Sequence, residues 1–159
     1  TPQPRVMLVH LPSEVPAQFV NYPTFSALGP LLVADHLENA SIAVAVSEAF
    51  SVKNPAETEM IHCDEGGWRL LGWAPQPEKL ARQCADKHWL IFSLDMFHRL
   101  DGNWGESVRT LAAAAKKTNP GLRIAVADCH VGGQDYIPIA PKRLVSSHTD
   151  LEFYMRGQS

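Results

Sequence analysis

The stretch from Trp89 to Ala127, WLIFSLDMFHRLDGNWGESVRTLAAAAKKTNPGLRIAVA, decides the fold of this chain. It begins with the apolar run WLIFS at residues 89–93, which is typical of a strand buried on both faces of a parallel sheet. A helix is predicted over residues 106–118, with apolar side chains on one face, and Asn119-Pro-Gly121 ends it. Residues 123–127 form a second run of the buried-strand type. Two such strands joined by a helix predict a right-handed β-α-β unit.

The same alternation of strands and helices extends toward both ends of the chain. Residues 5–10, RVMLVH, predict a first buried strand, and a helix opens at Gly29-Pro30, where proline is tolerated. Residues 41–46 and 150–155 supply two more strands, and residues 75–86 supply another helix. We therefore expect one α/β domain with a doubly wound, mostly parallel, five-stranded sheet. Its architecture is then the three-layer, flavodoxin-like (Rossmann-like) one, with strand order 2-1-3-4-5.

Composition and charge exclude several classes of function. The 159 residues are 45% hydrophobic and 19% charged, and no apolar run is long enough to cross a bilayer. The first residues lack the features of a signal peptide, so we expect a cytoplasmic protein without membrane contact. The three cysteines form no C-x-x-C pair, which favours reduced thiols over disulfides or zinc. The net charge of −3, without a basic cluster, argues against nucleic acid as a partner.

Three loops are expected to meet at one edge of the predicted sheet. In the order 2-1-3-4-5, the winding reverses between the first and third strands, and ligands bind outside the carboxyl ends of the strands there. Residues 11–25, 94–105 and 128–134 all lie on this edge. The first of these loops is long for a strand-to-helix connection, which favours ligand contact. Away from this edge, Asp64-Glu-Gly-Gly67 predicts a surface hairpin.

Four motifs occur along the chain in a fixed order. They are Leu28-Gly-Pro-Leu-Leu-Val-Ala-Asp-His-Leu37, Ile91-Phe-Ser93, Asn119-Pro-Gly-Leu-Arg-Ile-Ala-Val-Ala-Asp-Cys-His130 and Tyr154-Met-Arg-Gly-Gln158. Their order and spacing resemble the cobalamin-binding domain at the front of many radical S-adenosylmethionine enzymes. Two departures stand out: Ala127-Asp128 replaces the Gly-Gly of that family, and the family's acidic residues after Gly157 are missing.

This resemblance implies a role for the whole chain. Residues 1–159 would form a cobalamin-binding domain, a fragment of a longer protein in which a radical catalytic domain follows. Cobalamin would be bound base-off without a protein histidine on cobalt, so the chain supplies no metal ligand and no catalytic residue. The iron–sulfur cluster and S-adenosylmethionine belong to the radical domain, in cis or on a partner chain, because this sequence has no C-x-x-x-C-x-x-C spacing. The combined reaction would be methyltransferase-like, or a related radical step.

The cofactor contacts are expected on the three switch-point loops and near the carboxyl end of the chain. Ser93 would hydrogen-bond a corrin amide, and Arg99 would meet amide or phosphate groups. Gly132 and Gly133 would let the backbone approach the nucleotide tail closely. The full set of expected cofactor contacts is Leu11, Pro12, Tyr22, Ser93, Leu94, Asp95, Met96, Phe97, Arg99, Asp128, Cys129, His130, Gly132, Gly133 and Gly157. Trp68, Trp73 and Trp104 are further candidates, as apolar cover over the ring.

One motif resembles a cobalt-ligating sequence. Asp128-Cys-His-Val-Gly-Gly133 fits D-x-H-x-x-G, by which another class of cobalamin proteins supplies a histidine to cobalt. In that class the motif follows the first strand, whereas here it follows the fourth. We therefore expect His130 near the nucleotide tail, or in a plain loop role, and keep His10 as the other cobalt candidate because it ends the first strand.

Other functions of this architecture fit the sequence less well. A phosphate-accepting receiver domain needs two acidic residues directly after the first strand, and His10-Leu-Pro-Ser13 supplies none. Flavodoxin needs a loop rich in hydroxyls and glycine at the same place, and this loop is rich in proline. The serious alternative is a degenerate corrinoid-type domain that acts as a docking module without cofactor.

Overall fold

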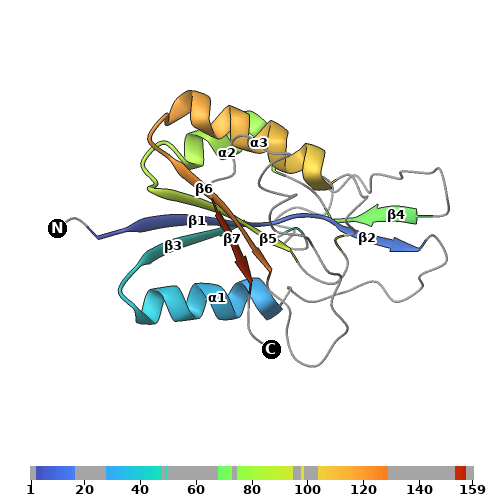
Figure 1. Cartoon of the computed structure of the whole chain (residues 1–159), viewed down its shortest axis with the longest axis horizontal. Helices are drawn as coiled ribbons and strands as arrows, with labels where there is room; N and C mark the ends of the chain where they lie inside the picture. Colours follow the sequence, from blue (N-terminus) through green and yellow to red (C-terminus); the bar gives the residue numbers. More distant parts are fainter. Residues whose placement is uncertain are drawn as a thin grey trace.

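A parallel sheet flanked by three helices forms the described part of the chain (Figure 1). The computed structural model describes residues 3–16, 28–47, 49, 68–72, 75–94, 98, 104–128 and 153–156. The strands of the main sheet are β1 (Arg5–His10), β3 (Ala43–Ser47), β5 (Trp89–Leu94), β6 (Arg123–Asp128) and β7 (Phe153–Arg156). The helices are α1 (Leu28–Asn39), α2 (Pro77–Gln83) and α3 (Trp104–Thr118).

The strands of this sheet run parallel in the order β3-β1-β5-β6-β7. Numbered along the chain within the sheet, this order is 2-1-3-4-5, as the sequence predicts. It is compatible with a flavodoxin-like fold. None of the helices in the described part of the chain has the length and apolar character that crossing a bilayer requires.

Helices cover both faces of the sheet. In Figure 1, α1 lies on one side of the strands, and α2 and α3 lie together on the other. The side chains of the strands alternate between these faces because successive residues of a strand point to opposite sides. Met7, Val9, Leu90 and Phe92 join the larger apolar cluster, which also contains residues of α2 and α3. Fully burying a side chain such as Phe92 contributes about 1.5–3 kcal/mol, so this cluster is a main source of stability.

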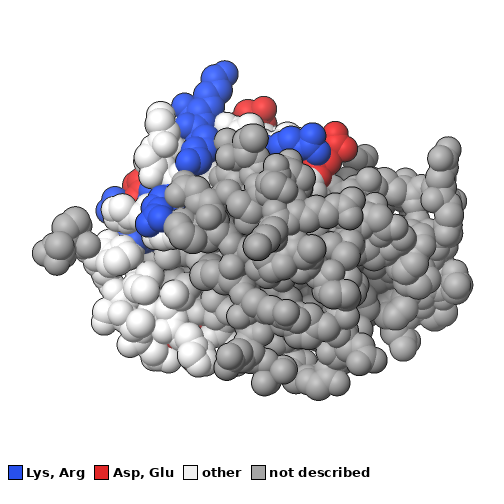
Figure 2. Space-filling model, in the orientation of Figure 1, with Lys and Arg blue, Asp and Glu red and all other residues white. Residues whose placement is uncertain are grey.

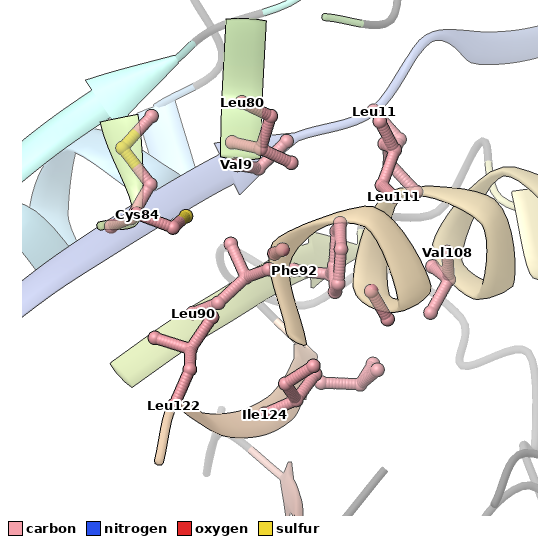
Figure 3. Close-up of a cluster of buried hydrophobic side chains, with 14 of the residues drawn as sticks. Val9, Leu11, Leu80, Cys84, Leu90, Phe92, Val108, Leu111, Leu122 and Ile124 are labelled. Carbon is pink, nitrogen blue, oxygen red and sulfur yellow. The ribbon is translucent and has the colours of Figure 1, made fainter. Parts of the chain in front are cut away.

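The members of the larger cluster lie close together in Figure 3. Those labelled there are Val9, Leu11, Leu80, Cys84, Leu90, Phe92, Val108, Leu111, Leu122 and Ile124. On the opposite, outer side of α2 and α3, charged side chains face solvent, and Figure 2 shows Lys and Arg with Asp or Glu between them on this part of the surface. This pattern of one apolar and one charged side is typical of a helix that covers a sheet.

Asn119 joins the ends of α2 and α3. Its side-chain amide donates to the carbonyl oxygens of Cys84 at 3.0 Å and Lys87 at 2.8 Å. Both carbonyls lie in the turn after α2, and that of Cys84 also accepts a hydrogen bond from the Lys87 backbone N–H at 3.1 Å. α3 itself begins with Glu106 in its first turn and ends with Lys116 and Lys117, which suits the helix dipole.

Polar contacts link the amino ends of the central strands of the sheet. The Arg5 backbone N–H donates to Nδ1 of His88 at 3.0 Å, and the Arg5 guanidinium lies 3.6 Å from the Asp86 carboxylate. A hydrogen bond from Lys87 is the main reason why the pKa of Asp86 lies below its usual range. The guanidinium of Arg123 stacks 4.4 Å from the ring centre of Trp89. These contacts tie the amino ends of β1, β5 and β6 together.

A second, two-stranded sheet lies beyond the carboxyl end of β1. Strand β2 (Ser13–Pro16) pairs antiparallel with β4 (Trp68–Leu71), with Ser13 opposite Leu71. The sequence had indicated only a loop over residues 11–25, so β2 is a new element. The predicted hairpin at residues 64–67 lies outside the described residues, and the observed partner of β4 is β2.

Candidate functional site

The winding of the sheet reverses at β1. Its neighbours are β3 on one side and β5 on the other, and the helices α1 and α2 that follow β1 and β3 lie on opposite faces (Figure 1). The carboxyl ends of β1 and β5 therefore border the crevice in which open α/β sheets bind ligands. This position agrees with the edge that the sequence predicts for the site.

A row of polar and small residues crosses this edge on the α1 face. His10 pairs in register with Ser93, and Ser93 pairs with Ala127. Leu8 and Ile91, two positions earlier on their strands, belong to the apolar cluster that includes Ala34 of α1. Because side chains alternate along a strand, His10, Ser93 and Ala127 continue that same face. The α1 face thus changes from apolar to polar or small at its carboxyl end.

Buried polar side chains concentrate at this edge. In the part of the chain that the structure describes, those with almost no exposure are His10, Ser13, Ser93 and His98. His10 ends β1, Ser13 begins β2, and Ser93 lies near the end of β5. Buried polar groups are costly unless they are hydrogen-bonded, so their gathering at a switch point indicates a site.

The two buried histidines connect the segments on either side of the crevice. The rings of His10 and His98 meet edge to face, with centroids 5.6 Å apart. Nε2 of His98 lies 3.2 Å from the carbonyl oxygen of Leu11. A carbonyl oxygen only accepts hydrogen bonds, so this geometry assigns the proton to Nε2 of His98. His98 thereby joins the segment after β5 to the segment after β1.

The two buried serines differ in how their hydroxyls are satisfied. Oγ of Ser93 donates to the carbonyl oxygen of Val9 at 3.4 Å, which is longer than a typical hydroxyl hydrogen bond. It therefore keeps capacity to contact another group. Oγ of Ser13 is buried and finds no hydrogen-bond partner among the described residues. Such a group costs about 1–3 kcal/mol and calls for a functional explanation.

The structure describes five of the predicted cofactor contacts. Leu11, Pro12, Ser93 and Leu94 are buried at the predicted edge, and Asp128 ends β6 in register with Leu94. The side chains of Leu11 and Leu94 pack in the larger apolar cluster. These two residues could therefore contact a ligand only through their backbone N–H and carbonyl groups. The other predicted contacts lie outside the described residues: Tyr22, Asp95, Met96, Phe97, Arg99, Cys129, His130, Gly132, Gly133 and Gly157.

Of the three tryptophan candidates, the structure describes the surroundings of Trp104. Trp104 is 4% exposed and belongs to the larger apolar cluster beside α2 and α3, so it serves the core rather than covering a ligand. Trp68 begins β4, and Trp73 lies outside the described residues.

Sequence reasoning missed two residues of the site, His98 and Ser13. His98 lies within the predicted ligand loop at residues 94–105, and Ser13 lies within the loop at residues 11–25, but neither is among the predicted contacts. The available signal was position, because each lies within a few residues of the carboxyl end of a buried strand.

No protein-family model matches this chain, and no curated protein matches it either.

Proposed function

We propose that this domain binds cobalamin across the carboxyl ends of β1 and β5. The cofactor is held base-off, without a protein histidine on cobalt, and is presented to a radical S-adenosylmethionine domain in cis or on a partner chain. The domain is then a flavodoxin-like, three-layer cofactor module with no catalytic residue of its own. Bound cobalamin supplies a cobalt centre for methyl transfer or a related radical step, and the partner domain shapes the substrate pocket.

The observation that carries this proposal is the row His10–Ser93–Ala127 at the switch point. A corrin is wide and carries many peripheral carboxamides, so it needs polar partners from several segments at once. The hydroxyls of Ser93 and Ser13 are groups of this kind, and they come from different strands. Ala127 continues the row as a small side chain, which suits close approach of a bulky ligand. The residues present are thus compatible with the cofactor.

The four sequence motifs, in their order along the chain, are the reason for choosing cobalamin as the ligand. The row by itself does not select a ligand, and the resemblance of four consecutive motifs to corrinoid domains is what favours cobalamin. In this arrangement the nucleotide tail runs from Ser93 toward residues 128–133, and His130 contacts the tail rather than cobalt. We further propose a cytoplasmic location, since Cys84 is a free, buried thiol.

One observation favours the alternative, a docking module without cofactor. Leu31 and Leu32 on α1 are each 41% exposed, and Val46 on the edge strand β3 is 39% exposed. Exposed large apolar side chains can contribute to a contact with another protein. In this reading their partner is the radical catalytic domain, and the switch-point edge holds no ligand.

A binding experiment separates the two functions. The domain is mixed with hydroxocobalamin, under oxidising and then reducing conditions, and free ligand is removed by gel filtration. We expect corrinoid absorbance to elute with the protein and its reduced form to show a base-off spectrum. If folded protein, checked by circular dichroism, retains no corrinoid under either condition, cobalamin binding is wrong and the docking module takes its place.

A further inference from the structure

We propose that the outer edge of β3 pairs antiparallel with the same edge of a second copy of this chain, so that two sheets join across a two-fold axis. β3 is the terminal strand of the main sheet, and in the described part of the chain β1 is the strand that pairs with it. Pairing of the two edges needs no cofactor. The inference therefore goes beyond the proposed function, and it is tested without cobalamin.

The backbone of β3 presents hydrogen-bonding groups along this outer edge. The N–H of Ala43 donates to the carbonyl oxygen of Pro4 and so faces β1. Backbone groups of successive residues in a parallel ladder point to alternate sides, so those of Val44 and Val46 point away from β1. Val46 is also 39% exposed, which shows that this side of the strand is accessible. An open edge of this kind is a template for a strand of another chain.

β3 lacks the features that usually protect a sheet edge. Proteins prevent edge pairing with charged side chains, proline or a bulge. The strand reads Ala-Val-Ala-Val-Ser, without charge or proline, and its register with β1 is continuous from Ala43 to Ser47. At the other end of the sheet, by contrast, β7 carries Arg156. The β3 strand thus contains nothing that opposes pairing with a further strand.

The symmetry of the strand favours a second copy as its partner. Val44 and Val46 flank Ala45, so a two-fold axis at Ala45 brings Val44 of one copy opposite Val46 of the other. Their outward N–H and carbonyl groups then match in both directions, as in the hydrogen-bonded pairs of an antiparallel ladder. The side chain of Val44 packs in the cluster on the α1 face, and that of Val46 shares this face, so β-branched pairs meet across the two strands. Because the strand is uncharged, its self-pairing brings no like charges together.

The size of the contact predicts how stable the dimer is. Stable interfaces bury about 1,200–2,000 Å² in total, and two paired strands of five residues bury less than this. Helix α1 contacts β3, and the two-fold axis places both copies of α1 on the same face of the joined sheet. The exposed Leu31 and Leu32 add apolar surface on α1. We therefore expect a monomer–dimer equilibrium that depends on protein concentration.

Analytical ultracentrifugation of the whole chain, from micromolar to millimolar concentration, measures this equilibrium. The average mass of wild-type protein should rise with concentration from that of one chain toward that of two. Val46→Lys places a charge on the edge and should weaken dimerisation about tenfold or more. Ala113→Lys adds the same charge at an exposed position of α3, on the other side of the sheet, and should dimerise like wild-type protein.

Disulfide cross-linking tests the register of the two strands. In the proposed pairing, Ala45 lies opposite its own copy in a non-hydrogen-bonded pair, with Cα atoms about 4.5 Å apart, which a disulfide can span. The two copies of Val46 lie about 8 Å apart, which is too far. On mild oxidation, Ala45→Cys should therefore form a dimer faster than Val46→Cys, although position 46 is the more exposed. Peptide mapping confirms that the disulfide joins the two substituted positions.

Each measurement can overturn the inference. Wild-type protein that stays monomeric at every concentration would leave the edge to a strand of another protein. A dimer that Val46→Lys and Ala113→Lys affect equally would have to form through another surface, provided that circular dichroism shows both variants folded. Faster cross-linking of Val46→Cys than of Ala45→Cys would indicate random collision according to exposure, and the two-fold pairing at Ala45 would be wrong.

Discussion

The rings of His10 and His98 meet edge to face at 85°, with 5.6 Å between their centroids, and this contact joins the end of β1 to the segment after β5. The hydrogen bond between Nε2 of His98 and the Leu11 carbonyl, at 3.2 Å, reinforces the same junction. Both strands border the proposed ligand crevice. The junction therefore fixes the geometry of the edge before a ligand arrives.

Replacing His98 tests this junction. His98→Leu removes the hydrogen bond and leaves the Leu11 carbonyl without it, so we expect a loss of about 1–3 kcal/mol in the free energy of unfolding. His98→Gln places an amide donor near the position of Nε2 and should recover part of that loss. Cobalamin affinity should follow the same order, with His98→Gln between wild-type protein and His98→Leu. Urea unfolding and cobalamin titration measure the two effects.

The glutamine variant is the control for size and polarity. If His98→Gln and His98→Leu are indistinguishable in both measurements, the hydrogen bond to Leu11 does not support the edge. A loss of stability without any change in affinity would limit His98 to a structural role.

Cys84 is expected to be unreactive in the folded protein. Burial raises the pKa of its thiol from 9.0 to about 11, and the nearby Lys87 opposes this only in part. The thiolate is the reactive form, so at pH 8 alkylation of Cys84 by iodoacetamide should be much slower in folded than in urea-unfolded protein. Peptide mapping by mass spectrometry distinguishes Cys84 from the other cysteines. Equal rates in the two states would show that the thiol is not shielded.

The same shift predicts how stability depends on pH. The folded protein holds the Cys84 proton more tightly than the unfolded chain, so this contribution is fully present below pH 9. It is lost as pH rises from about 9 to 11 and amounts to at most about 2–3 kcal/mol. Cys84→Ala should flatten this part of the stability profile, measured by urea unfolding between pH 8 and pH 11.

Gly72 should tolerate no side chain. Its φ is +91°, which favours glycine, and a Cβ there would lie 2.8 Å from the carbonyl oxygen of Ala49. We expect Gly72→Ala to lower the free energy of unfolding by about 1–3 kcal/mol. Gly121→Ala is the matched control, because its Cβ would meet only the Asn119 side chain at an ordinary 3.7 Å. Thermal unfolding measures the stability of both variants. If Gly72→Ala lowers stability no more than Gly121→Ala does, the close approach of Gly72 to Ala49 is contradicted.

The central strands follow directly from the sequence. Residues 5–10 were predicted as a strand and form β1, and the run predicted at 89–93 forms β5 with one more residue, Leu94. Continuous apolar runs of five or six residues favour a strand buried on both faces, because a buried helix is usually longer. The start of β3 was predicted two residues early, at Ser41, whose φ of 60° places it in the turn after α1. A local turn of this kind is not encoded in the apolar pattern.

Nonlocal contacts account for what the sequence did not predict. β2 and β4 are four-residue strands from distant parts of the chain, and neither has a periodic pattern that indicates its partner. The sheet order that defines the candidate edge was predicted, and so was the position of Ser93 at the end of a buried strand. The burial of His98 and Ser13 depends on what packs around them, and only the three-dimensional arrangement reveals it.

Ser93 offers the sharpest test of where the ligand lies. Its side chain is fully buried in the row between His10 and Ala127, on the face that α1 covers. Ser93→Leu adds bulk to this row and removes the hydroxyl, so we expect cobalamin affinity to fall about tenfold or more. Ser107→Leu makes the same chemical change on α3, away from the edge, and should leave affinity unchanged. Both affinities are measured by titration.

Overpacking at Ser93 also costs stability, about 1–3 kcal/mol, so folding must be separated from binding. Titrations are therefore made at a temperature where circular dichroism shows that each variant is folded. Ser93→Ala removes only the hydroxyl, whose bond to the Val9 carbonyl is long at 3.4 Å, so its affinity should fall less, by about fivefold. The difference in affinity between wild-type protein and Ser93→Ala then measures the contribution of the hydroxyl. The further difference between Ser93→Ala and Ser93→Leu measures the effect of the added side-chain volume. Equal affinities for folded Ser93→Leu and Ser107→Leu would move the ligand away from this edge, because no molecule lying across β1 and β5 could ignore the added bulk.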